Sequence, residues 1–207
     1  MADSLIDLIK VLRDCTGAGL MDCKSALLAN DSDIDKATDW LREKGLAKAA
    51  KKADRIAAEG LALAITCPTC GDTVVLEVNC ETDFVAKGDQ FKELVTKVGQ
   101  IILKERPADV EAAKTLTSEL FTEATLKMGE KFDLHRFVIF SKGSNTIGAY
   151  IHMGGKIAVA VEMQGADAEF AKQIAMHIAA NNPLYAKVTD VPADAREHEM
   201  SIQKEAA

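Results

Sequence analysis

The sequence predicts an α+β protein in which a small helical bundle precedes a core of hairpins and helices. Three observations support this class. Apolar residues recur at helical spacing through the first 54 residues. From Leu61 onward, apolar residues form short β-rich runs separated by turn residues. The order strand, polar break, Asp, Phe and helix then occurs twice, which indicates a weakly duplicated core.

Residues 1–54 are expected to form three helices and the start of a connector. Apolar residues on one face mark the first helix: Leu5, Leu8, Ile9 and Leu12. The glycines of TGAG end this helix, because glycine tolerates positive φ. We expect a second helix from Met21 to about Ala29 and a third that ends at Gly45. The Ala- and Lys-rich segment after Gly45 is typical of a semi-rigid helical connector.

Residues 55–140 are expected to form the first half of the core. The runs LALAIT and TVVLEV predict a β-hairpin across the turn CPTCGD. A helix that contains Phe91 follows, then a helix over about Ala108–Met128 and a strand, HRFVIFS.

Residues 141–207 are expected to repeat this plan as a second half that breaks off within a helix. A hairpin turns at Gly154 and Gly155, and the helix of GADAEFAKQIAMHIAA follows. Aligning the two halves makes Phe170 the counterpart of Phe84, and we expect Phe170 to pack at the start of its helix.

Composition excludes several classes of protein. Among 207 residues, 48% are apolar and 28% charged, so a hydrophobic core is expected, whereas 5% aromatic residues disfavour an aromatic-lined groove for sugar or single-stranded nucleic acid. A net charge of −7 disfavours general binding to phosphate backbones. No apolar run approaches the roughly 18 residues of a membrane span, so we expect a soluble protein. Five cysteines without a signal-peptide pattern predict the cytoplasm.

Catalytic and metal motifs are sparse. The four histidines lack the HExxH spacing, and there is no P-loop, dinucleotide fingerprint or GxSxG. Cys67 and Cys70 form a CxxC, but a structural zinc site usually needs four ligands. A thioredoxin-type redox pair needs a helix N-terminus beside the thiols, whereas this pair falls in a hairpin turn, so redox chemistry has still less support than zinc. The sequence supports no enzyme activity.

Two surfaces are candidates for binding a protein. Leu20 and Met21 follow the glycine break between the first two helices, where they belong either to the core or to an exposed contact. Lys10 and Arg13, one helical turn apart, would form the rim of such a contact. The second candidate is Phe84. Composition favours burial of its ring in the core, and the alternative is an exposed hydrophobic wedge beside a carboxylate.

Four motifs together resemble the elongation factor Ts family of bacterial translation: LRDCTGAGLMDCKSAL, KAAKKADRIAAEG, EVNCETDFVAKGDQF and MHIAANNP. They occur in the family's order and span nearly the whole chain. The resemblance implies a ubiquitin-associated-like three-helix bundle followed by a two-part core. It also implies that longer members continue past Ala207, so we expect this chain to be a fragment or a short member.

The resemblance implies a guanine-nucleotide exchange factor that binds GDP-bound elongation factor Tu, a GTPase. In the family, the TDFV motif displaces the groups that hold magnesium, a role that falls on Thr82, Asp83, Phe84 and Val85. The N-terminal module docks on the same partner domain, which implies contacts from Lys10, Arg13, Leu20 and Met21. The second half grips another partner domain, which implies contacts from His152, Gly154, Gly155, His177 and Ile178. The resemblance tips the expectation for Phe84 toward an exposed loop tip.

No cofactor, metal, membrane or direct nucleic-acid contact is implied, and two complexes could pair as a dimer of heterodimers. Two other hypotheses stay open: an adaptor whose ubiquitin-associated-like bundle binds a protein without exchange activity, and a zinc or redox protein that acts through Cys67 and Cys70.

Overall fold

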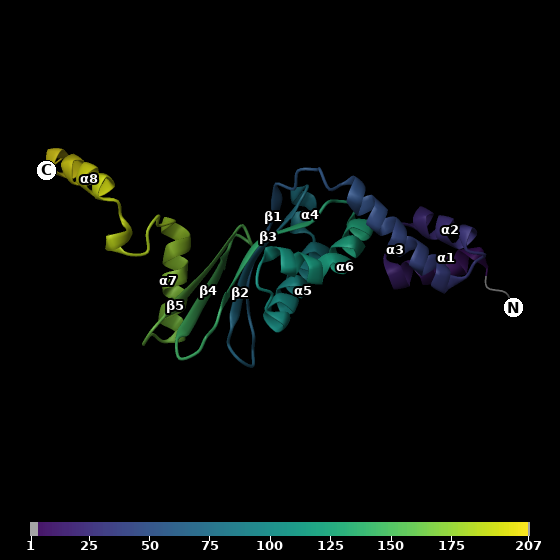
Figure 1. The fold of residues 1–207 in the computed structure, drawn as a ribbon, viewed down its shortest axis with the longest axis horizontal. Coiled ribbons are helices and arrows are strands. Elements are labelled where there is room, and N and C mark those ends of the chain that lie inside the picture. The colour runs from purple at the N-terminus through teal and green to yellow at the C-terminus, as the bar shows by residue number, and fades with distance from the viewer. Residues whose placement is uncertain (1–3, 207) are drawn as a thin grey trace.

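The computed structural model describes residues 4–206. The molecule is elongated, with a helical bundle at one end, two antiparallel sheets in the middle and a C-terminal helix at the other end (Figure 1). This arrangement confirms the predicted α+β class. The division into residues 1–54, 55–140 and 141–207 stays a prediction. Among the described residues, no helix combines the length and the apolar character needed to cross a membrane.

The N-terminal bundle consists of α1 (Leu5–Thr16), α2 (Leu20–Ala29) and α3 (Ile34–Lys51). The Ser4 and Asp33 side chains cap α1 and α3 by accepting backbone N–H groups, which satisfies donors that a helix start leaves unpaired. A small apolar core joins the three helices, with these residues buried: Ile9, Leu12, Ala18, Cys23, Ala26, Leu27, Ala37 and Leu41.

The predicted end of the third helix at Gly45 is wrong, because α3 continues to Lys51. Gly45 is buried where α3 crosses α6, and a Cβ at this position would lie 3.3 Å from the Thr122 methyl group. Glycine therefore lets the two helices approach closely instead of ending one of them. The Ala- and Lys-rich residues beyond Gly45 are good helix formers and extend the helix by further turns.

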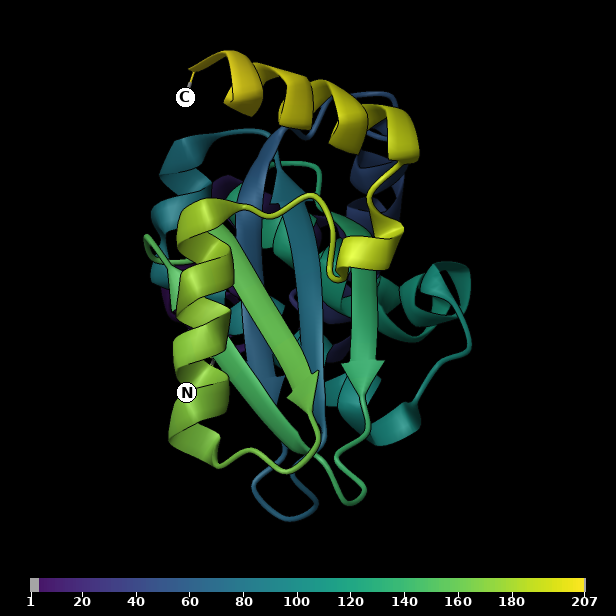
Figure 2. The same cartoon turned by 90° about the vertical axis from the view of Figure 1, so that its left-hand side faces the viewer.

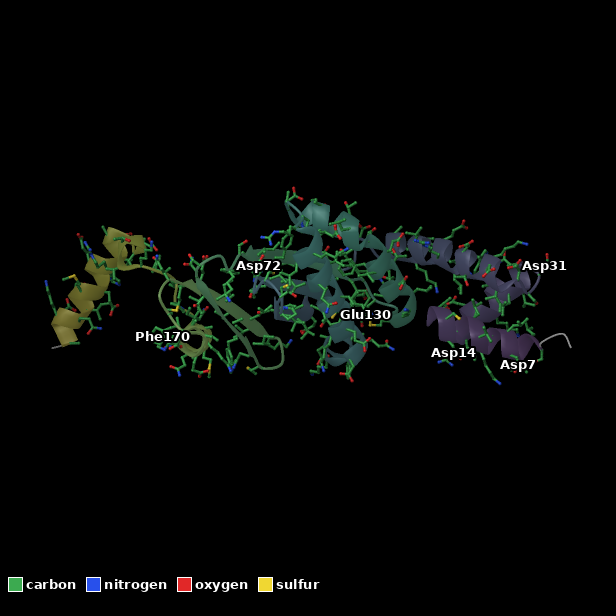
Figure 3. The ribbon with its side chains drawn as sticks, turned by 90° about the horizontal axis from the view of Figure 1, so that it is seen from below. Asp7, Asp14, Asp31, Asp72, Glu130 and Phe170 are labelled. Carbon is green, nitrogen blue, oxygen red and sulfur yellow. The ribbon has the colours of Figure 1, made fainter. Side chains whose placement is uncertain are left out.

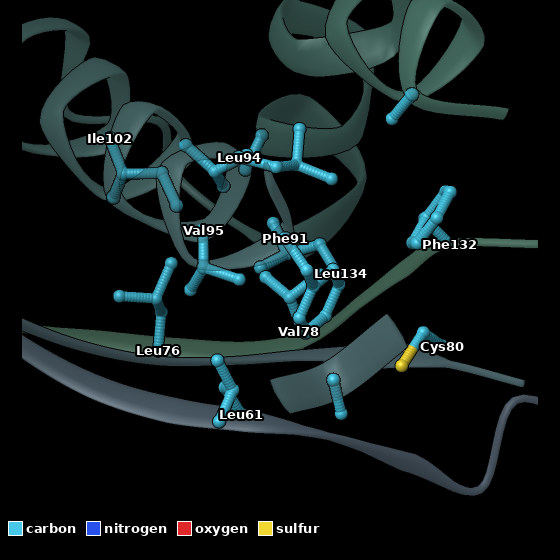
Figure 4. Close-up of a cluster of buried hydrophobic side chains, with 14 of the residues drawn as sticks. Leu61, Leu76, Val78, Cys80, Phe91, Leu94, Val95, Ile102, Phe132 and Leu134 are labelled. Carbon is cyan, nitrogen blue, oxygen red and sulfur yellow. The ribbon is translucent and has the colours of Figure 1, made fainter. Parts of the chain in front are cut away.

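The first half of the core is a three-stranded sheet covered by two helices. Strands β1 (Glu59–Thr66), β2 (Thr73–Cys80) and β3 (Asp133–Phe140) pair antiparallel in that order. Helices α5 (Asp89–Glu105) and α6 (Val110–Met128) cover one face. Figure 4 shows apolar side chains of α5 resting on the sheet.

The second half has one hairpin and one helix. Strands β4 (Thr146–His152) and β5 (Ile157–Met163) pair antiparallel, and α7 (Ala168–Asn181) runs alongside them (Figure 2). The Phe170 ring is 48% exposed, so the prediction that it packs at the helix start is wrong. α7 packs on β4 and β5, and within residues 4–206 no helix packs against it as extensively as α6 packs against α5.

The two sheets are in contact, and the last elements lie apart from the core. Strand β5 approaches both β1 and β2, and β4 approaches β1. The Ala62 N–H of β1 donates to the Gly155 carbonyl of the β4–β5 turn (2.7 Å). A 3₁₀ turn, η1 (Val188–Asp190), and α8 (Ala193–Ala206) end the chain, and no residue of either element is buried.

Candidate functional site

Phe84 lies on a short helix after the first hairpin. α4 spans Asp83–Lys87 and begins at its cap residue Thr82, whose hydroxyl accepts the Val85 N–H (3.4 Å). The ring of Phe84 is 84% exposed, which agrees with the family-based expectation and not with the composition. The expected loop tip is wrong, however: a helix holds the backbone around the ring.

The opposite side of α4 anchors it to the core. Ala86 is buried, and Val85 is half-buried against the apolar cluster of the first half. Neighbouring residues on a helix point about 100° apart, so burying Val85 and Ala86 turns Phe84 toward solvent. Of the four predicted TDFV positions, Thr82 and Phe84 are exposed and Asp83 and Val85 are half-buried. The Thr82 hydroxyl caps the helix and Val85 packs on the core, so these two hold α4 in place.

A carboxylate from a distant segment clamps the entry to α4. Glu130, between α6 and β3, accepts the backbone N–H of Glu81 (3.0 Å), the backbone N–H of Thr82 (3.1 Å) and the Thr82 hydroxyl (2.5 Å). Figure 3 labels Glu130 in the middle of the molecule. Charge-assisted hydrogen bonds of this kind are among the stronger ones in proteins, so Glu130 fixes the angle at which the chain enters α4.

Glu81 in turn binds the segment that follows Glu130 and the connector before β1. Its carboxylate accepts the Lys131 N–H (2.7 Å) and pairs with the Arg55 guanidinium (3.1 Å). The Lys131 ammonium donates to the carbonyls of Ala53 (2.5 Å) and Arg55 (2.9 Å). We call Arg55, Glu81, Glu130 and Lys131 the α4 clamp. It ties the connector, the end of β2 and the loop before β3 into one support for α4.

Two lysines act on the Asp83 carboxylate. The Lys87 ammonium lies 2.7 Å from the Asp83 carboxylate and, by this hydrogen bond and its charge, holds the pKa of Asp83 below its usual value. Lys156, directly before β5 in the second half, lowers the pKa of Asp83 further by its charge. Lys156 itself pairs with Glu59 (2.8 Å), which raises the pKa of the lysine. The second hairpin therefore reaches the neighbourhood of α4.

The predicted residues of the N-terminal bundle are all on its surface. Leu20 is 52% exposed and Met21 67% exposed, at the first turn of α2. This decides the alternative left open by the sequence, because neither side chain belongs to the bundle core. Lys10 and Arg13 are also exposed on α1, where Lys10 pairs weakly with Asp7 (3.5 Å). Their contact with a partner stays a prediction.

The predicted residues of the second half divide into exposed and structural ones. Gly154 is exposed, His152 is half-buried, and the Tyr150 hydroxyl lies 3.0 Å from its Nδ1. Gly155 is buried with φ of 102°, and a Cβ there would lie 2.8 Å from the Leu61 side chain. Gly155 therefore joins the sheets, and this turn offers a partner its exposed Gly154.

His177 and Ile178 lie near the C-terminal end of α7. His177 is exposed, and the Asn181 side-chain amide donates to its carbonyl (2.9 Å), while Ile178 is half-buried. Since α7 runs back along β5, this end of the helix is at the same end of the hairpin as the turn at Gly154. The structure thus brings the predicted residues of the second half to one end of it.

Sequence reasoning missed Glu130, Arg55, Lys131 and Lys156. Each acts on a residue far away in the chain: Glu130 is 49 positions from Glu81. Arg55 lies within the motif KAAKKADRIAAEG and the other three lie outside the quoted motifs, but no motif indicates a partner that is 26 or 49 positions away.

Comparison with known proteins identifies the family. The sequence model described as Elongation factor TS matches residues 81–207, which begins at the clamp residue Glu81 and includes all of α4. This chain belongs to the elongation factor Ts family. It is also 49% identical to elongation factor Ts of Pediococcus pentosaceus, over 98% of this chain and 71% of that relative. As an elongation factor Ts, it is a translation elongation factor of protein biosynthesis.

Proposed function

We propose that this elongation factor Ts binds GDP-bound elongation factor Tu and accelerates the release of GDP. The observation that carries the proposal is the exposure of Phe84 on a clamped helix. Moving a large apolar ring from water into a partner's pocket is favourable in free energy. The exposed ring therefore makes binding energy available for insertion.

The proposed step is mechanical and electrostatic. Magnesium holds GDP by bridging phosphate oxygens and protein groups. Inserting Phe84 beside that site would favour an arrangement of the partner in which the magnesium-holding groups are displaced. Asp83 would meet the same region as a carboxylate, since Lys87 and Lys156 keep it ionised. No covalent bond forms, and no cofactor takes part.

Thr82 and Val85 support the wedge from within the chain. Thr82 caps α4 and is held by Glu130, and Val85 packs on the core. A wedge on a flexible loop would have to become ordered on binding, which costs free energy. The short helix and its clamp remove most of that cost, so more of the contact energy is available for displacing GDP.

Two further surfaces are proposed to hold the partner while the wedge acts. The bundle offers Lys10, Arg13, Leu20 and Met21, which combine two exposed apolar side chains with two cations. The second half offers His152, Gly154, His177 and Ile178, with Gly155 shaping the turn. Contacts on either side of α4 would fix the position of Phe84 between them. We place this complex in the cytoplasm, without nucleic acid, and a dimer of such complexes is one possible assembly.

Coupling between the two ligands must be mutual. Whatever factor the exchange protein removes from the affinity of elongation factor Tu for GDP, GDP removes from the affinity of that protein for its partner. Lowering the barrier to release by about 1.4 kcal/mol speeds release about tenfold, so a single displaced ion contact has a measurable effect.

The test is a GDP-release assay. Elongation factor Tu is loaded with fluorescent GDP and mixed with this chain and excess unlabelled GDP. We expect release to accelerate with wild type and to slow by about tenfold or more in Phe84→Ala, since the substitution removes the wedge. Phe170→Ala is the matched control, because it also removes a solvent-exposed ring at a helix start.

The outcomes separate the hypotheses. Release that wild type leaves unchanged would contradict the exchange function; if the two proteins still bound each other, the adaptor hypothesis would take its place. Release that is accelerated equally by wild type and by Phe84→Ala would contradict the wedge and leave the exchange function standing.

A further inference from the structure

The tip of the first hairpin carries two of the five cysteines. Cys67 and Cys70 lie in the turn between β1 and β2, where Cys67 is half-buried and Cys70 exposed. The remaining cysteines differ in setting: Cys15 is exposed, and Cys23 and Cys80 are buried. The proposed exchange function makes no use of the CxxC.

The turn folds its backbone around the Cys67 sulfur. The Cys67 N–H donates to the Asp72 carbonyl (2.8 Å), and the Gly71 N–H donates to the Cys67 carbonyl (2.9 Å). The Cys70 N–H then points at the Cys67 sulfur, 3.5 Å away. Gly71 has φ of 78°, a left-handed conformation that glycine adopts without strain. The closed turn holds Cys67 and Cys70 at one tip, with the Cys70 backbone against the Cys67 sulfur.

Charged groups from two other segments hold the base of the turn. The Asp72 carboxylate accepts the Lys142 N–H (2.9 Å) and the Arg106 guanidinium (2.6 Å). Arg106 also donates to the Ser141 hydroxyl (2.7 Å). These contacts hold the base of the turn that carries the cysteines, although its tip is open to solvent.

The two thiols have opposite properties. The Cys70 N–H, the Cys70 thiol and the Thr69 N–H lower the pKa of Cys67 to about 7. The pKa of Cys70 is raised, because its thiol donates to Cys67. Burial raises the pKa of Cys80 to about 11. Near neutral pH, Cys67 is thus the nucleophile and Cys70 the protonated neighbour. The turn amides act on the Cys67 sulfur as the N–H groups of a helix N-terminus would.

We propose that Cys67 and Cys70 are a redox-active pair that exchanges reversibly with small-molecule disulfides. The Cys67 thiolate attacks one sulfur of the small disulfide, a Cys67–sulfur bond forms, and one small thiolate leaves. Cys70 then loses its proton, and its thiolate attacks the Cys67 sulfur and displaces the second small thiolate. The two small thiolates take up the two protons. The protein dithiol is oxidised to a disulfide, and the small disulfide is reduced to two thiols.

A structural metal is a weaker explanation of the same pair. A four-coordinate zinc site needs two ligands beyond Cys67 and Cys70. Within residues 4–206, no group of three or more His, Cys, Asp or Glu side chains is arranged to hold a metal. The frame around Cys67 supplies N–H donors, which stabilise a thiolate, and its nearest carboxylate, Asp72, is already paired with Arg106.

The redox pair is separate from the proposed wedge. Strands β1 and β2 run from the CxxC tip to α4, and eight strand residues span about 26 Å. Figure 1 shows the β1–β2 turn and α4 at opposite ends of the strands. We therefore expect oxidation to leave GDP release unchanged, so that each proposal can fail without the other.

The first experiment measures disulfide formation in the full chain. Reduced protein is incubated with buffers of oxidised and reduced glutathione, and each cysteine is followed by alkylation and mass spectrometry. We expect wild type to lose two hydrogen atoms and form a Cys67–Cys70 bond that reduced glutathione reopens. Cys70→Ser should stop at a mixed disulfide on Cys67, and Cys67→Ser should form neither product at a comparable rate. Circular dichroism checks that each variant is folded.

The second experiment measures the reactivity of Cys67. Its alkylation rate should rise with pH and reach half its maximum near pH 7, because the thiolate is the reacting form. At pH 7 the rate should exceed that of an unperturbed peptide thiol about threefold, since a larger thiolate fraction outweighs lower intrinsic nucleophilicity.

Three results would overturn the proposal. The first is a mixed disulfide that never resolves in wild type. The second is Cys15 reacting as fast as Cys67. The third is stoichiometric zinc in the purified wild type that Cys67→Ser abolishes, which would make the pair a metal site.

Discussion

The two halves of the core place the same residue type in opposite environments. Phe91 is the third residue of α5, and Phe170 is the third residue of α7. Phe91 is completely buried and stacks on Phe132 with ring centroids 5.6 Å apart, whereas Phe170 is 48% exposed. Position in the helix makes Phe91 the counterpart of Phe170. The predicted pairing of Phe170 with Phe84 is therefore wrong.

The difference lies in what covers each helix. α5 is enclosed between its sheet and α6, so both of its sides are packed. α7 has its own hairpin on one side only. Phe84 belongs to neither pattern, because α4 lies between β2 and α5, and β5 leads directly to α7 in the second half. Helix α4 is thus an addition to the plan that the two halves share, and the exposure of Phe84 does not follow from the duplication.

Truncating the two corresponding rings should give the largest difference in stability between the two halves. Phe91→Ala should lower the free energy of unfolding by about 3–5 kcal/mol, because it leaves a cavity between α5, α6 and the sheet. Phe170→Ala, the matched control, should lower it by about 1 kcal/mol or less, since its ring is half in water already. Urea unfolding followed by circular dichroism measures both. Equal losses would show that α7 is covered as fully as α5.

The second half should depend on a close backbone contact. A Cβ on Gly148 would lie 2.2 Å from the Ala171 carbonyl carbon, and backbone cannot move aside as a side chain can. Gly148→Ala should therefore push α7 off its hairpin and destabilise the protein by about 1–3 kcal/mol. Limited proteolysis should cut first near α7.

Gly19→Ala is the control for this prediction. A Cβ on Gly19 meets only the Asp22 carboxylate at 3.5 Å, an ordinary contact, so the loss should stay below about 1 kcal/mol. If Gly148→Ala behaved like Gly19→Ala, the hairpin and helix would not be held by their close approach.

The α4 clamp should be needed to hold α4 in place, because the second half of the core has no corresponding helix. Glu130→Ala leaves the N–H groups of Glu81 and Thr82 without their acceptor and should cost about 1–3 kcal/mol. Hydrogen exchange should speed up in α4, and GDP release should slow as the wedge loses its orientation. Glu123→Ala is the control, since the Glu123 carboxylate has one exposed ion pair, 3.7 Å from Lys127. Unchanged exchange in Glu130→Ala would contradict the clamp.

Acid should loosen the same clamp by a smaller amount. Burial raises the pKa of Glu81, but the Lys131 N–H and Arg55 outweigh it, and the net pKa is lowered from 4.5. A lowered folded-state pKa gives stability that is present above the unfolded value and lost as pH falls through the folded value. Wild type should therefore exceed Glu81→Gln in stability above pH 4.5, by about 1 kcal/mol or less, and the gap should close in stronger acid. A gap that persists well below this range would contradict the assignment.

Elements and turns followed from the sequence with few errors. The hairpin turns at CPTCGD and at Gly154–Gly155 are where turn residues predicted them, and α2 covers the predicted residues. These features depend on backbone preference and on periodicity, which act over a few residues. The third helix was misjudged because Gly45 was taken as a local stop signal, whereas its role is set by α6, more than 70 positions away.

The candidate site was predicted in part. The TDFV motif led to α4, and Leu20 and Met21 led to the exposed start of α2. The support for the motif could not be predicted, because Glu130, Lys131 and Lys156 reach α4 only through the folding of distant segments. The contact between the Cys70 N–H and the Cys67 sulfur could not be predicted either, since CxxC spacing does not say where the turn amides point.

By itself, the sequence determined most of the helices and strands, where the hairpins turn, and which family the chain resembles, because these depend on local patterns and long motifs. The tertiary structure alone decided that Phe84 faces water, that Phe91 is buried and Phe170 is not, and that a carboxylate 49 positions away holds the start of α4 in place. The reason is physical: exposure depends on which other elements cover a surface, and no residue carries that information in its own neighbourhood.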